Sequence, residues 1–325
     1  MLILNAAQVV EALPMPDAIT AMLRALTLIS DPMTAIPPRI HVELAEKYGT
    51  TLVMPGQIHD QQGKSLVVKI VSVCNGNIER GLPNILGVVN VFDPETGQPL
   101  ALLDGSALTG IRTAAASGVA TDLLARQDAR RLAIIGSGAQ ARSHLTAMRA
   151  VRDIEQVKVY SRNRDHVLNF ISSLDVDIEV QPADSADEAV GDANIVCAVT
   201  SSSTPVFDDA AIQPGTHINA IGSYKPEVVE IPAATVVRAR VFVDHRESVL
   251  EEAGDLIQPI QRGEITATHI AGEIGELIAG KVAGRQSADE VTLFKSVGNT
   301  LEDVIGAQTV YDNANRMGLG NSVAM

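Results

Sequence analysis

The chain has 325 residues, a formal net charge of −14 at pH 7 and 46% hydrophobic residues. This length accommodates two domains with separate hydrophobic cores. The acidic balance argues against nucleic acid or an anionic membrane as a partner, because no basic tract offsets it. No apolar run approaches the ~20 residues that cross a bilayer, and Met1–Asn5 lacks the basic region of a signal peptide. We therefore expect a cytoplasmic protein.

The first 110 residues combine helical and strand patterns. The predicted helices are Ala6–Leu13 and Pro16–Ser30, and the predicted strands are Thr51–Met54, Ser65–Val73, Ile85–Phe92 and Pro99–Leu103. The strands are separated by segments rich in proline and glycine, and Asp93–Gly97 has the composition of a tight turn. This pattern predicts antiparallel hairpins. A helix over Ile111–Ala125 is expected to bridge to the next domain.

A dinucleotide-binding turn follows the bridging helix. The apolar strand Leu132–Ile135 runs through Gly-Ser-Gly-Ala-Gln-Ala, residues 136–141, into the helix-forming stretch Ala139–Val151. Gly136 allows the tight turn, and Gly138 lets the backbone approach a pyrophosphate. The N-terminus of the helix then supplies N–H groups and the positive end of its dipole to the phosphates.

Strand and helix patterns alternate over the rest of the chain. The segments are Val157–Tyr160, Asp165–Leu174, Ile178–Gln181, Ala186–Val190, Ile195–Thr200, His217–Ile221 and Val241–Asp244. Such alternation predicts an α/β fold, with a parallel sheet covered by helices on both faces. A last helix, Thr300–Arg316, is expected to return to the first domain. We therefore predict a Rossmann domain over 116–299 and an α+β domain over 1–115 with 300–325, with substrate in the cleft between them.

The segment after the second Rossmann strand bears on the choice of cofactor. It reads Ser161-Arg162-Asn163-Arg164, with no acid before Asp165. A guanidinium binds phosphate oxygens in a fork, whereas an aspartate would repel them. We therefore predict NADPH as the preferred cofactor, with NADH as the alternative if these arginines are only solvated loop charges.

No metal centre is expected. The chain has no His-x-x-x-His or Cys-x-x-Cys spacing, and its two cysteines, Cys74 and Cys197, lie far apart in the sequence. Each is flanked by apolar residues, which predicts buried free thiols in a reducing compartment.

Several runs together resemble the ornithine cyclodeaminase/mu-crystallin family over nearly the whole chain. They are Pro37-Pro38-Arg39, Met54-Pro55-Gly56, Lys69, Gly81-Leu82-Pro83-Asn84, Asp93-Pro94-Glu95-Thr96-Gly97, the stretch 108–117, the glycine-rich turn and Ser296-Val297-Gly298. The resemblance implies a Rossmann domain, an N-terminal domain that pairs with its twin through a shared sheet, and hence a homodimer. It also implies hydride transfer between nicotinamide and the α-carbon of a small amino or imino acid.

Two departures from the family pattern narrow the substrate. Tyr224 stands where ornithine cyclodeaminases carry a catalytic Asp, and Leu52 stands where they carry a Glu that engages ornithine. Without these carboxylates a distal ammonium loses its partners. The resemblance therefore favours reduction of pyrroline-2-carboxylate to L-proline, or of piperideine-2-carboxylate to L-pipecolate. The alternatives are an alanine or other amino-acid dehydrogenase, an ornithine cyclodeaminase and a mu-crystallin-like NADPH-dependent binding protein.

Three charged residues are the candidate catalytic groups. Lys69 shares one face of its strand with Val67 and Val71, and it either reaches the surface or enters a polar cleft where its pKa falls. As a functional group it would bind the substrate carboxylate or imine nitrogen and assist protonation. Arg112, at the start of the bridging helix, needs a local anion against the helix dipole, and we assign it to the substrate carboxylate rather than to a solvated surface. Asp303 either orients Lys69 or a proton-relay water, or begins a solvated helix face together with Glu302.

The remaining assignments rest on local sequence or on the resemblance, and those of Asn84, Thr113 and Ser296 rest on the resemblance alone. Arg39 is either a second fork to the carboxylate or part of an exposed loop, Met54 is assigned to the substrate, and Tyr224 either closes the pocket or is structural. The expected cofactor contacts are Asn84, Arg112, Thr113, Gly136, Gly138, Ala139, Gln140, Ser161, Arg162, Arg164, Thr200, Ser201, Ile221 and Ser296.

Overall fold

The structure is a computed structural model that describes residues 1–31, 34, 36–45, 48–74 and 76–324. The chain forms two compact units, Met1–Thr113 with Asn299–Met325, and Ala114–Gly298. Elements of the first unit are β1 (Leu2–Leu4), α1 (Ala6–Ala12), α2 (Met15–Ile29), β2 (Ile40–Glu43), β3 (Gly49–Asp60), β4 (Gly63–Cys74), η2 (Ile78–Arg80), β5 (Ile85–Phe92), β6 (Pro99–Asp104), α11 (Thr300–Met317) and β15 (Asn321–Ser322). The helix α3 (Gly105–Leu124) continues from the first unit into the second.

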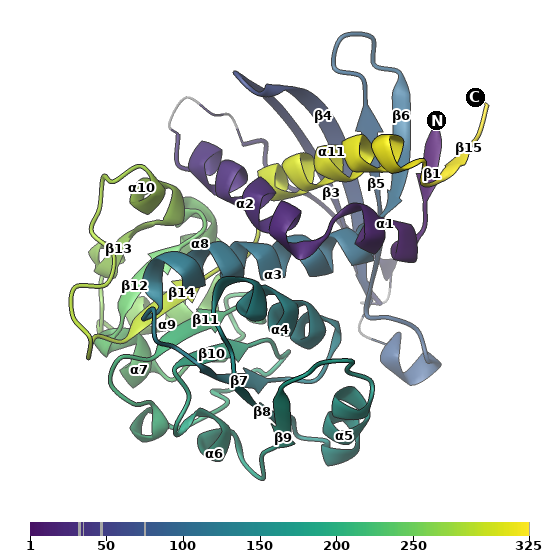
Figure 1. The fold of residues 1–325 in the computed structure, drawn as a ribbon. Coiled ribbons are helices and arrows are strands. Elements are labelled where there is room, and N and C mark those ends of the chain that lie inside the picture. Colours follow the sequence, from purple (N-terminus) through teal and green to yellow (C-terminus); the bar gives the residue numbers. More distant parts are fainter. Residues whose placement is uncertain (32–33, 35, 46–47, 75, 325) are drawn as a thin grey trace. The chain divides into compact units, whose positions relative to one another are not determined.

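The first unit is a mixed sheet with helices on one face. Its strand order is β15-β1-β6-β5-β4-β3-β2, and the neighbours from β6 to β2 are antiparallel. This confirms the hairpins predicted for β3 to β6, whereas β2 was not predicted. The short strand β1 was not predicted, and it pairs in parallel with β6 and antiparallel with β15, which brings the two ends of the chain together (Figure 1). The helix α11 packs on β3, β4 and α2, so the C-terminal segment completes this unit.

Alternation along the strands separates a buried face from an exposed one. Met54 of β3 lies opposite Lys69 of β4, and both side chains are buried on the face that α11 covers. Ile70 of β4 and Val88 of β5 point to the other face, where they are 37% and 38% exposed. The first sheet therefore places a lysine in the core and leaves apolar side chains on its outer face.

The second unit is a parallel sheet. Its elements are β7 (Arg131–Ile135), α4 (Ala139–Val151), β8 (Gln156–Tyr160), α5 (Arg164–Ser172), β9 (Glu179–Pro182), α6 (Ala186–Val190), β10 (Ile195–Ala198), η3 (Asp209–Ala211), β11 (His217–Ala220), α7 (Ala233–Arg238), β12 (Arg240–Val243), α8 (Arg246–Glu252), α9 (Gly254–Gln261), η4 (Ala267–His269), β13 (Ile270–Glu273), α10 (Ile274–Ile278) and β14 (Thr292–Lys295). The strand order is β13-β12-β14-β11-β10-β7-β8-β9, and every printed neighbour pair is parallel. This arrangement confirms the predicted Rossmann architecture.

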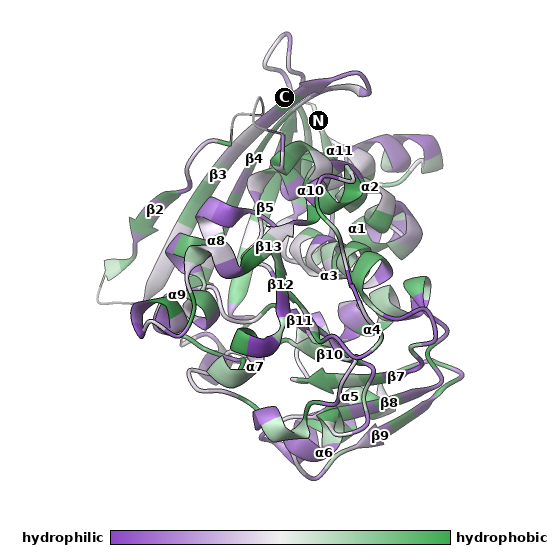
Figure 2. Ribbon diagram, turned by 90° about the vertical axis from the view of Figure 1, so that its left-hand side faces the viewer, coloured by the Kyte–Doolittle hydropathy of each residue, from purple (hydrophilic) through white to green (hydrophobic). Residues whose placement is uncertain are grey.

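The core of the second unit lies along its central strands. The strands β10 and β11 are buried at every position, and the edge strand β9 is not. Figure 2, coloured by hydropathy, shows hydrophobic residues along the neighbouring strand β7. Strand order reverses between β7 and β10, because β8 and β9 extend the sheet on one side while β10 and β11 extend it on the other. Such a switch point is where open α/β sheets bind ligands.

Two sequence expectations need correction. The helix α3 begins at Gly105, six residues earlier than predicted. Cys197 is buried as expected, but Cys74 is partly exposed because it ends β4; both cysteines are free. Among the described residues, no single helix is long and apolar enough to cross a membrane; α1 and α2 meet that test only together, and they are bent by 78°.

Candidate active site

Lys69 occupies the inner face of the first sheet. Alternation along β4 leaves Val67, Lys69 and Val71 only 0%, 2% and 6% exposed, which confirms that they share one face. The Lys69 Nζ donates a hydrogen bond of 3.0 Å to Oδ1 of Asp303. A buried ammonium needs such a partner, since loss of water disfavours its charge. Lys69 is therefore a buried charged group and not a surface lysine.

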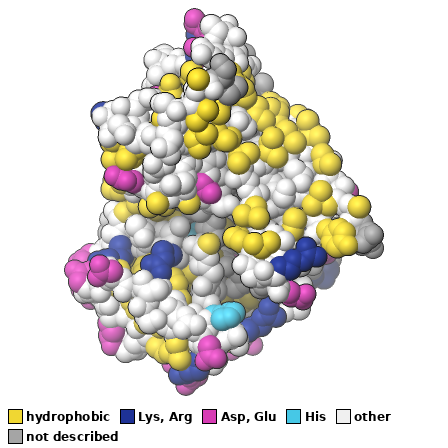
Figure 3. Space-filling model, turned by 90° about the vertical axis from the view of Figure 1, so that its right-hand side faces the viewer, with side chains coloured by type: hydrophobic (Ala, Val, Ile, Leu, Met, Phe, Trp, Pro, Cys, Tyr) yellow, Lys and Arg dark blue, Asp and Glu magenta, His cyan; other side chains and the backbone are white. Residues whose placement is uncertain are grey.

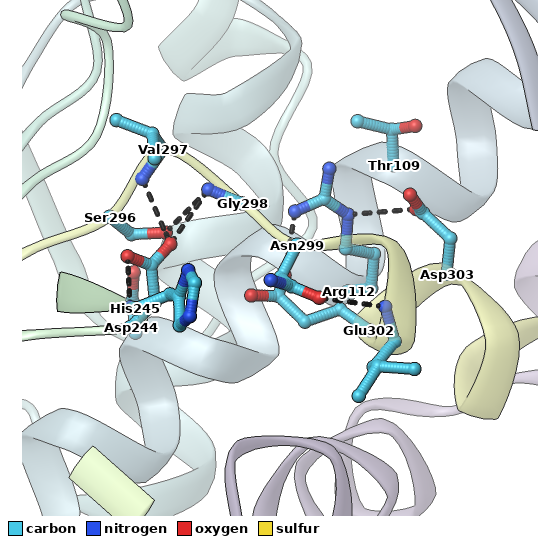
Figure 4. Close-up of polar contacts among 12 residues, drawn as sticks. Thr109, Arg112, Asp244, His245, Ser296, Val297, Gly298, Asn299, Glu302 and Asp303 are labelled. Atoms are coloured by element: carbon cyan, nitrogen blue, oxygen red, sulfur yellow. Dashed lines mark hydrogen bonds and ion pairs between the residues drawn. The ribbon is translucent and has the colours of Figure 1, made fainter. Parts of the chain in front are cut away.

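Two consecutive acids at the start of α11 complete a charge cluster in the first unit. Asn299 caps this helix by accepting the backbone N–H of Leu301, and Glu302 and Asp303 follow in the first turn with 0% exposure. Arg112 donates from Nη1 to Oε2 of Glu302 at 2.6 Å and from Nε to Oδ1 of Asp303 at 3.1 Å (Figure 4). The interpretation of these acids as a solvated helix face is therefore wrong.

Arg112 lies two turns inside α3, not at its N-terminus. The helix begins at Gly105, and Asp104 accepts the backbone N–H of Ala107 at 2.8 Å in the manner of a cap. The argument from the helix dipole consequently does not apply to Arg112. Arg112 is only 6% exposed, and the anions that balance its charge are the carboxylates of α11. It is thus not a solvated surface arginine.

The cluster changes the acid–base properties of its members. Burial lowers the pKa of Lys69 to about 8; Asp303 opposes this effect, and the positive charges of Arg112 and Arg39 add to it. Burial alone would raise the pKa of Asp303, but the attraction of Arg112 and Lys69 outweighs it and holds that pKa below its usual value. Lys69 is therefore a group that can exchange a proton near neutral pH.

A glycine lets α11 approach the sheet closely enough to form this cluster. A Cβ built on Gly56 would lie 2.6 Å from Cγ2 of Thr300 and 2.7 Å from Cγ2 of Val304. These contacts are closer than real carbon atoms allow, so any side chain at Gly56 would push the start of α11 away. Asp303 lies in that same turn, between Thr300 and Val304.

Of the other candidates in the first unit, Met54 and Arg39 lie near the charge cluster, and Asn84 is described by its burial alone. Met54 is 3% exposed and pairs with Lys69 across the ladder. Arg39 is partly buried and close enough to influence the pKa of both Lys69 and Asp303. The Oδ1 atom of Asn84 is buried and has no hydrogen-bond partner among the described residues.

Thr113 is the last residue of the first unit before α3 continues into the second. It is 8% exposed and follows Arg112 directly in the helix. The structure therefore brings the three candidate catalytic residues together and places Met54 and Arg39 near them. For Thr113, the structure gives its burial and its position in α3 next to Arg112.

The residues of the glycine-rich turn fit a dinucleotide. Gly136 has φ +117°, and a Cβ there would lie 2.8 Å from the carbonyl oxygen of Val199, so only glycine suits this position. A Cβ on Gly138 would meet no described atom within 4 Å, which leaves the backbone open. Gly138 is the N-cap of α4, and no side chain of a described residue caps the helix there. The Oε1 atom of Gln140, in the first turn, is buried and has no hydrogen-bond partner among the described residues. The first turn of α4 can therefore offer its N–H groups to a pyrophosphate.

The segment after β8 lies beside this turn. Tyr160 accepts the backbone N–H of Gly136 at 2.8 Å, which ties the ends of β7 and β8 together. Ser161 is partly buried and Arg162 is exposed at this edge. Arg164 forms an ion pair with Asp184, both largely exposed, so it is less available to a ligand than Arg162.

The other second-unit candidates follow strand ends. Thr200 donates from its backbone N–H and hydroxyl to one oxygen of Glu230, whereas Ser201 is exposed. Ile221 is 9% exposed directly after β11. Ser296 follows β14, and its hydroxyl donates to Oδ2 of Asp244 at 2.7 Å (Figure 4).

Tyr224 lies in the loop after β11. Its side chain is 36% exposed, and partial burial raises the pKa of its hydroxyl. A tyrosine whose pKa is raised stays protonated at neutral pH and can act as a hydrogen-bond donor.

Sequence reasoning missed four buried charged residues. Asp244, Asp255, Glu230 and Lys295 are each 0% exposed and bind backbone groups of the second unit. Glu230 stands in the apolar run Val-Val-Glu-Ile-Pro, Asp244 and Lys295 directly follow apolar residues, and Asp255 directly precedes apolar residues. That pattern is the only sequence signal for them, since a charge inside an apolar run is seldom fully buried unless it is paired.

Comparison with known proteins places this chain in a known family. The model of the ornithine cyclodeaminase/mu-crystallin family matches residues 1–318. The chain is 39% identical over 327 residues to a Delta(1)-pyrroline-2-carboxylate reductase of Bacillus cereus, an alignment that covers 99% of each protein.

Solved structures agree with this match. The Thermococcus litoralis Delta(1)-pyrroline-2-carboxylate reductase in complex with NADH and L-proline has a TM-score of 0.95 and 38% identity, covering 99% of this chain and 100% of that one. An archaeal alanine dehydrogenase dimer with bound NAD has a TM-score of 0.91 and 32% identity, covering 100% and 99%. The chain therefore belongs to the ornithine cyclodeaminase/mu-crystallin family.

Proposed function

We propose that this protein is a nicotinamide-dependent oxidoreductase that reduces the C=N bond of cyclic α-imino acids, with pyrroline-2-carboxylate as substrate and L-proline as product. One observation carries the proposal: Lys69 is a buried ammonium with a pKa of about 8, held by Asp303 beside the guanidinium of Arg112. The cluster combines a proposed proton donor, Lys69, with the guanidinium of Arg112, which can bind a carboxylate. A small imino acid presents the matching groups, a basic nitrogen next to a carboxylate.

The proposed chemistry balances with these residues. A reduced nicotinamide, when bound, would supply a hydride for the α-carbon, and the imine nitrogen would take up one proton. Arg112 binds the substrate carboxylate, which orients the C=N bond. Lys69 donates the proton to nitrogen and recovers one from solvent after product release. Asp303 keeps Lys69 protonated before the reaction, because its negative charge opposes the effect of burial.

The residue types at two positions, one in each unit, support a substrate without a distal ammonium. Leu52 lies on β3 two residues before Met54, so alternation gives both the same side of the strand. Tyr224 supplies no carboxylate after β11. Ornithine would bring a second ammonium, which needs a carboxylate partner when buried. A five-membered imine and its six-membered analogue, piperideine-2-carboxylate, need none.

A second candidate is reduction of an open-chain imine formed from pyruvate and ammonia. The similarity to the archaeal alanine dehydrogenase favours it. The same residues would serve, since Arg112 would bind the carboxylate and Lys69 would protonate the nitrogen. The two functions differ in their requirement for ammonia.

The test is nicotinamide oxidation by the purified protein, with pyrroline-2-carboxylate, piperideine-2-carboxylate, or pyruvate plus ammonia, and with ornithine and NAD as a further arm. We expect turnover with the cyclic imines without ammonia, and its loss in Lys69→Met. Lys64→Met is the matched control, because Lys64 lies on the same strand but is exposed and pairs with Glu95. Ammonia-dependent turnover alone would favour the dehydrogenase, and cofactor binding without turnover would favour a mu-crystallin-like binding role.

We further propose that NADPH is preferred over NADH. Arg162 is exposed after β8 and so is open to the additional phosphate of NADPH. The expected result is a fall of about tenfold or more in kcat/KM for NADPH in Arg162→Ala, with little change for NADH. Arg131→Ala is a control at the opposite end of the neighbouring strand β7. Equal effects of Arg162→Ala on both cofactors would contradict the preference.

A homodimer is the proposed assembly, with the outer face of the first sheet as the interface. Large apolar side chains on its strands are exposed, and hydrophobic side chains gather over the upper part of Figure 3. They include Ile40, Val42, Ile70, Leu86 and Val88. Monomers seldom expose such a patch without a partner. Sedimentation of the wild type and of Val88→Asp tests this: a dimer that the substitution converts to monomers supports the interface.

A further inference from the structure

Glu230 connects the ends of two neighbouring strands in the second unit. Its side chain is 0% exposed. Oε1 accepts the backbone N–H and the hydroxyl of Thr200 at 2.6 and 2.7 Å, and Oε2 accepts the backbone N–H groups of Gly222 and Ser223 at 2.5 and 3.1 Å. Thr200 follows β10, and Gly222 follows β11. One carboxylate therefore fixes two strand ends at once.

The two strand ends lie in direct backbone contact. A Cβ on Gly222 would lie 1.7 Å from the carbonyl oxygen of Thr200, so no side chain fits there. On the other side of β10, the carbonyl oxygen of Val199 lies 2.8 Å from where a Cβ of Gly136 would be. The backbone held by Glu230 thus lies directly against the glycine-rich turn, at the switch point of the sheet.

A second carboxylate and a lysine hold Glu230 in place. Asp255 accepts the backbone N–H groups of Glu230 and Ile231 at 2.7 and 3.0 Å through Oδ1. Its Oδ2 lies 2.9 Å from Nζ of Lys295, which also donates to the carbonyl oxygen of Ser223 at 2.5 Å. Lys295 ends β14, the neighbour of β11. Burying carboxylates is costly unless a positive charge is present, and Lys295 supplies that charge.

We propose that Glu230 is a positioning residue for the nicotinamide cofactor: it sets the backbone after β10 and β11 that forms one wall of the cofactor site. Four donors that hydrogen-bond to one charged acceptor hold this wall more rigidly than bonds to a neutral side chain would. The role rests on the proposed use of a nicotinamide cofactor, whereas the hydrogen-bond network itself does not. Glu230 acts through the backbone and takes no part in the chemistry.

The test compares Glu230→Gln with the wild type. A glutamine keeps the size but turns an NH₂ group toward backbone N–H groups at one strand end, which releases that end. We expect the Kd of NADH and NADPH, measured by calorimetry on the purified protein, to rise at least about tenfold, which corresponds to about 1.4 kcal/mol. We also expect faster amide hydrogen exchange in peptides covering 199–202 or 221–224 of the cofactor-free protein.

Asn194→Ala is the matched control. The Asn194 Oδ1 accepts the backbone N–H groups of Arg130 and Arg131, so it clamps backbone at the opposite, amino-terminal edge of the same sheet. It should lower the unfolding temperature while leaving the cofactor Kd within about twofold, since the clamp is remote from the carboxyl ends of the strands. If Glu230→Gln lowers only the unfolding temperature, or if both variants weaken cofactor binding equally, the proposal is overturned.

A second variant covers the case in which Glu230→Gln does not fold. Glu230→Asp keeps the charge beside Lys295 but is one carbon shorter, so it cannot reach both strand ends. The same rise in Kd and the same faster exchange are expected, and wild-type values would overturn the proposal. If the wild type binds neither nicotinamide, the proposed function and the cofactor role both fail, while the exchange measurement still reports on the network.

Discussion

Replacing Asp303 with asparagine isolates the electrostatic effect of one carboxylate on Lys69. The substitution keeps the shape of the side chain and removes the charge that Lys69 and Arg112 share. The negative charge of Asp303 raises the pKa of Lys69 toward about 8, whereas burial and the positive charges of Arg112 and Arg39 lower it. Without it, all the remaining named influences lower that pKa.

The size of the expected change in kcat/KM follows from the pKa of Lys69 in the wild type. Loss of an opposite charge at hydrogen-bond distance shifts a pKa by roughly 1 to 3 units. With a pKa of about 8, about three quarters of Lys69 is protonated at pH 7.5. A fall of about 1.5 units leaves roughly a tenth protonated, so kcat/KM at pH 7.5 drops about eightfold from protonation alone.

The assay is the pH profile of kcat/KM for pyrroline-2-carboxylate. In the wild type, kcat/KM should fall as the pH rises through about 8, because Lys69 then loses the proton that it donates. In Asp303→Asn the same decline should begin at lower pH. The imine also titrates, but identically in both assays, so the ratio of variant to wild type removes its contribution.

Glu302→Gln is the matched control for this experiment. Glu302 is equally buried in the same turn but pairs with Arg112, and its charge is not among the named influences on the pKa of Lys69. It should move the profile less than Asp303→Asn does. An unchanged or raised midpoint in Asp303→Asn would refute the reasoning, as would equal shifts in the two variants.

Three further substitutions test the framework of the two units. Gly56→Ala brings a methyl group to within 2.6 Å of Thr300 and should destabilise by about 1 to 3 kcal/mol in urea unfolding, whereas Gly76→Ala, whose methyl meets no described atom within 4 Å, should change little. Lys69→Met removes a group whose pKa is about 8 in the folded protein and 10.5 in the unfolded chain. The free energy of unfolding of the wild type minus that of this variant should therefore rise by about 3 kcal/mol as the pH increases from 8 to 10.5. A difference that does not change with pH would contradict the low pKa. Asp244→Asn disrupts the acceptor for three donors at the carboxyl end of β14 and should destabilise by about 1 to 3 kcal/mol, which urea unfolding also measures.

Strong local patterns made several elements predictable. The bounds of β5, α4 and α6 are those expected from sequence. A run of strand-forming residues defines β5, a glycine-rich turn leading into an alanine-rich run defines α4, and Ser185 caps the start of α6. The strand β3 is longer than predicted because Pro55 stays in the ladder opposite Val68, and Gly56 is needed under α11 rather than as a break. Proline and glycine at those positions are explained only by the tertiary packing.

The sequence predicted which residues form the candidate site but not the contacts between them. Alternation indicated the face of Lys69, and the family resemblance supplied Arg112 and Asp303. The position of Arg112 inside α3 was missed, since Gly105 and Gly110 weaken the helical pattern although Asp104 is a good capping residue. Glu302 was missed for a different reason: two adjacent acids at a helix start favour a solvated face unless another segment covers them.

The dependence of Lys69 on α11 explains why the chain returns to its first unit. Burial, Arg112 and Arg39 all lower the pKa of this lysine, and a lysine with only those neighbours would lose its proton below pH 8. The carboxylate that prevents this comes from residue 303, 234 residues away in the sequence, and it reaches Lys69 only because α11 packs on β3 at Gly56. The C-terminal helix therefore supplies one member of the proposed proton-donating pair, and the first unit needs residues from both ends of the chain to form it.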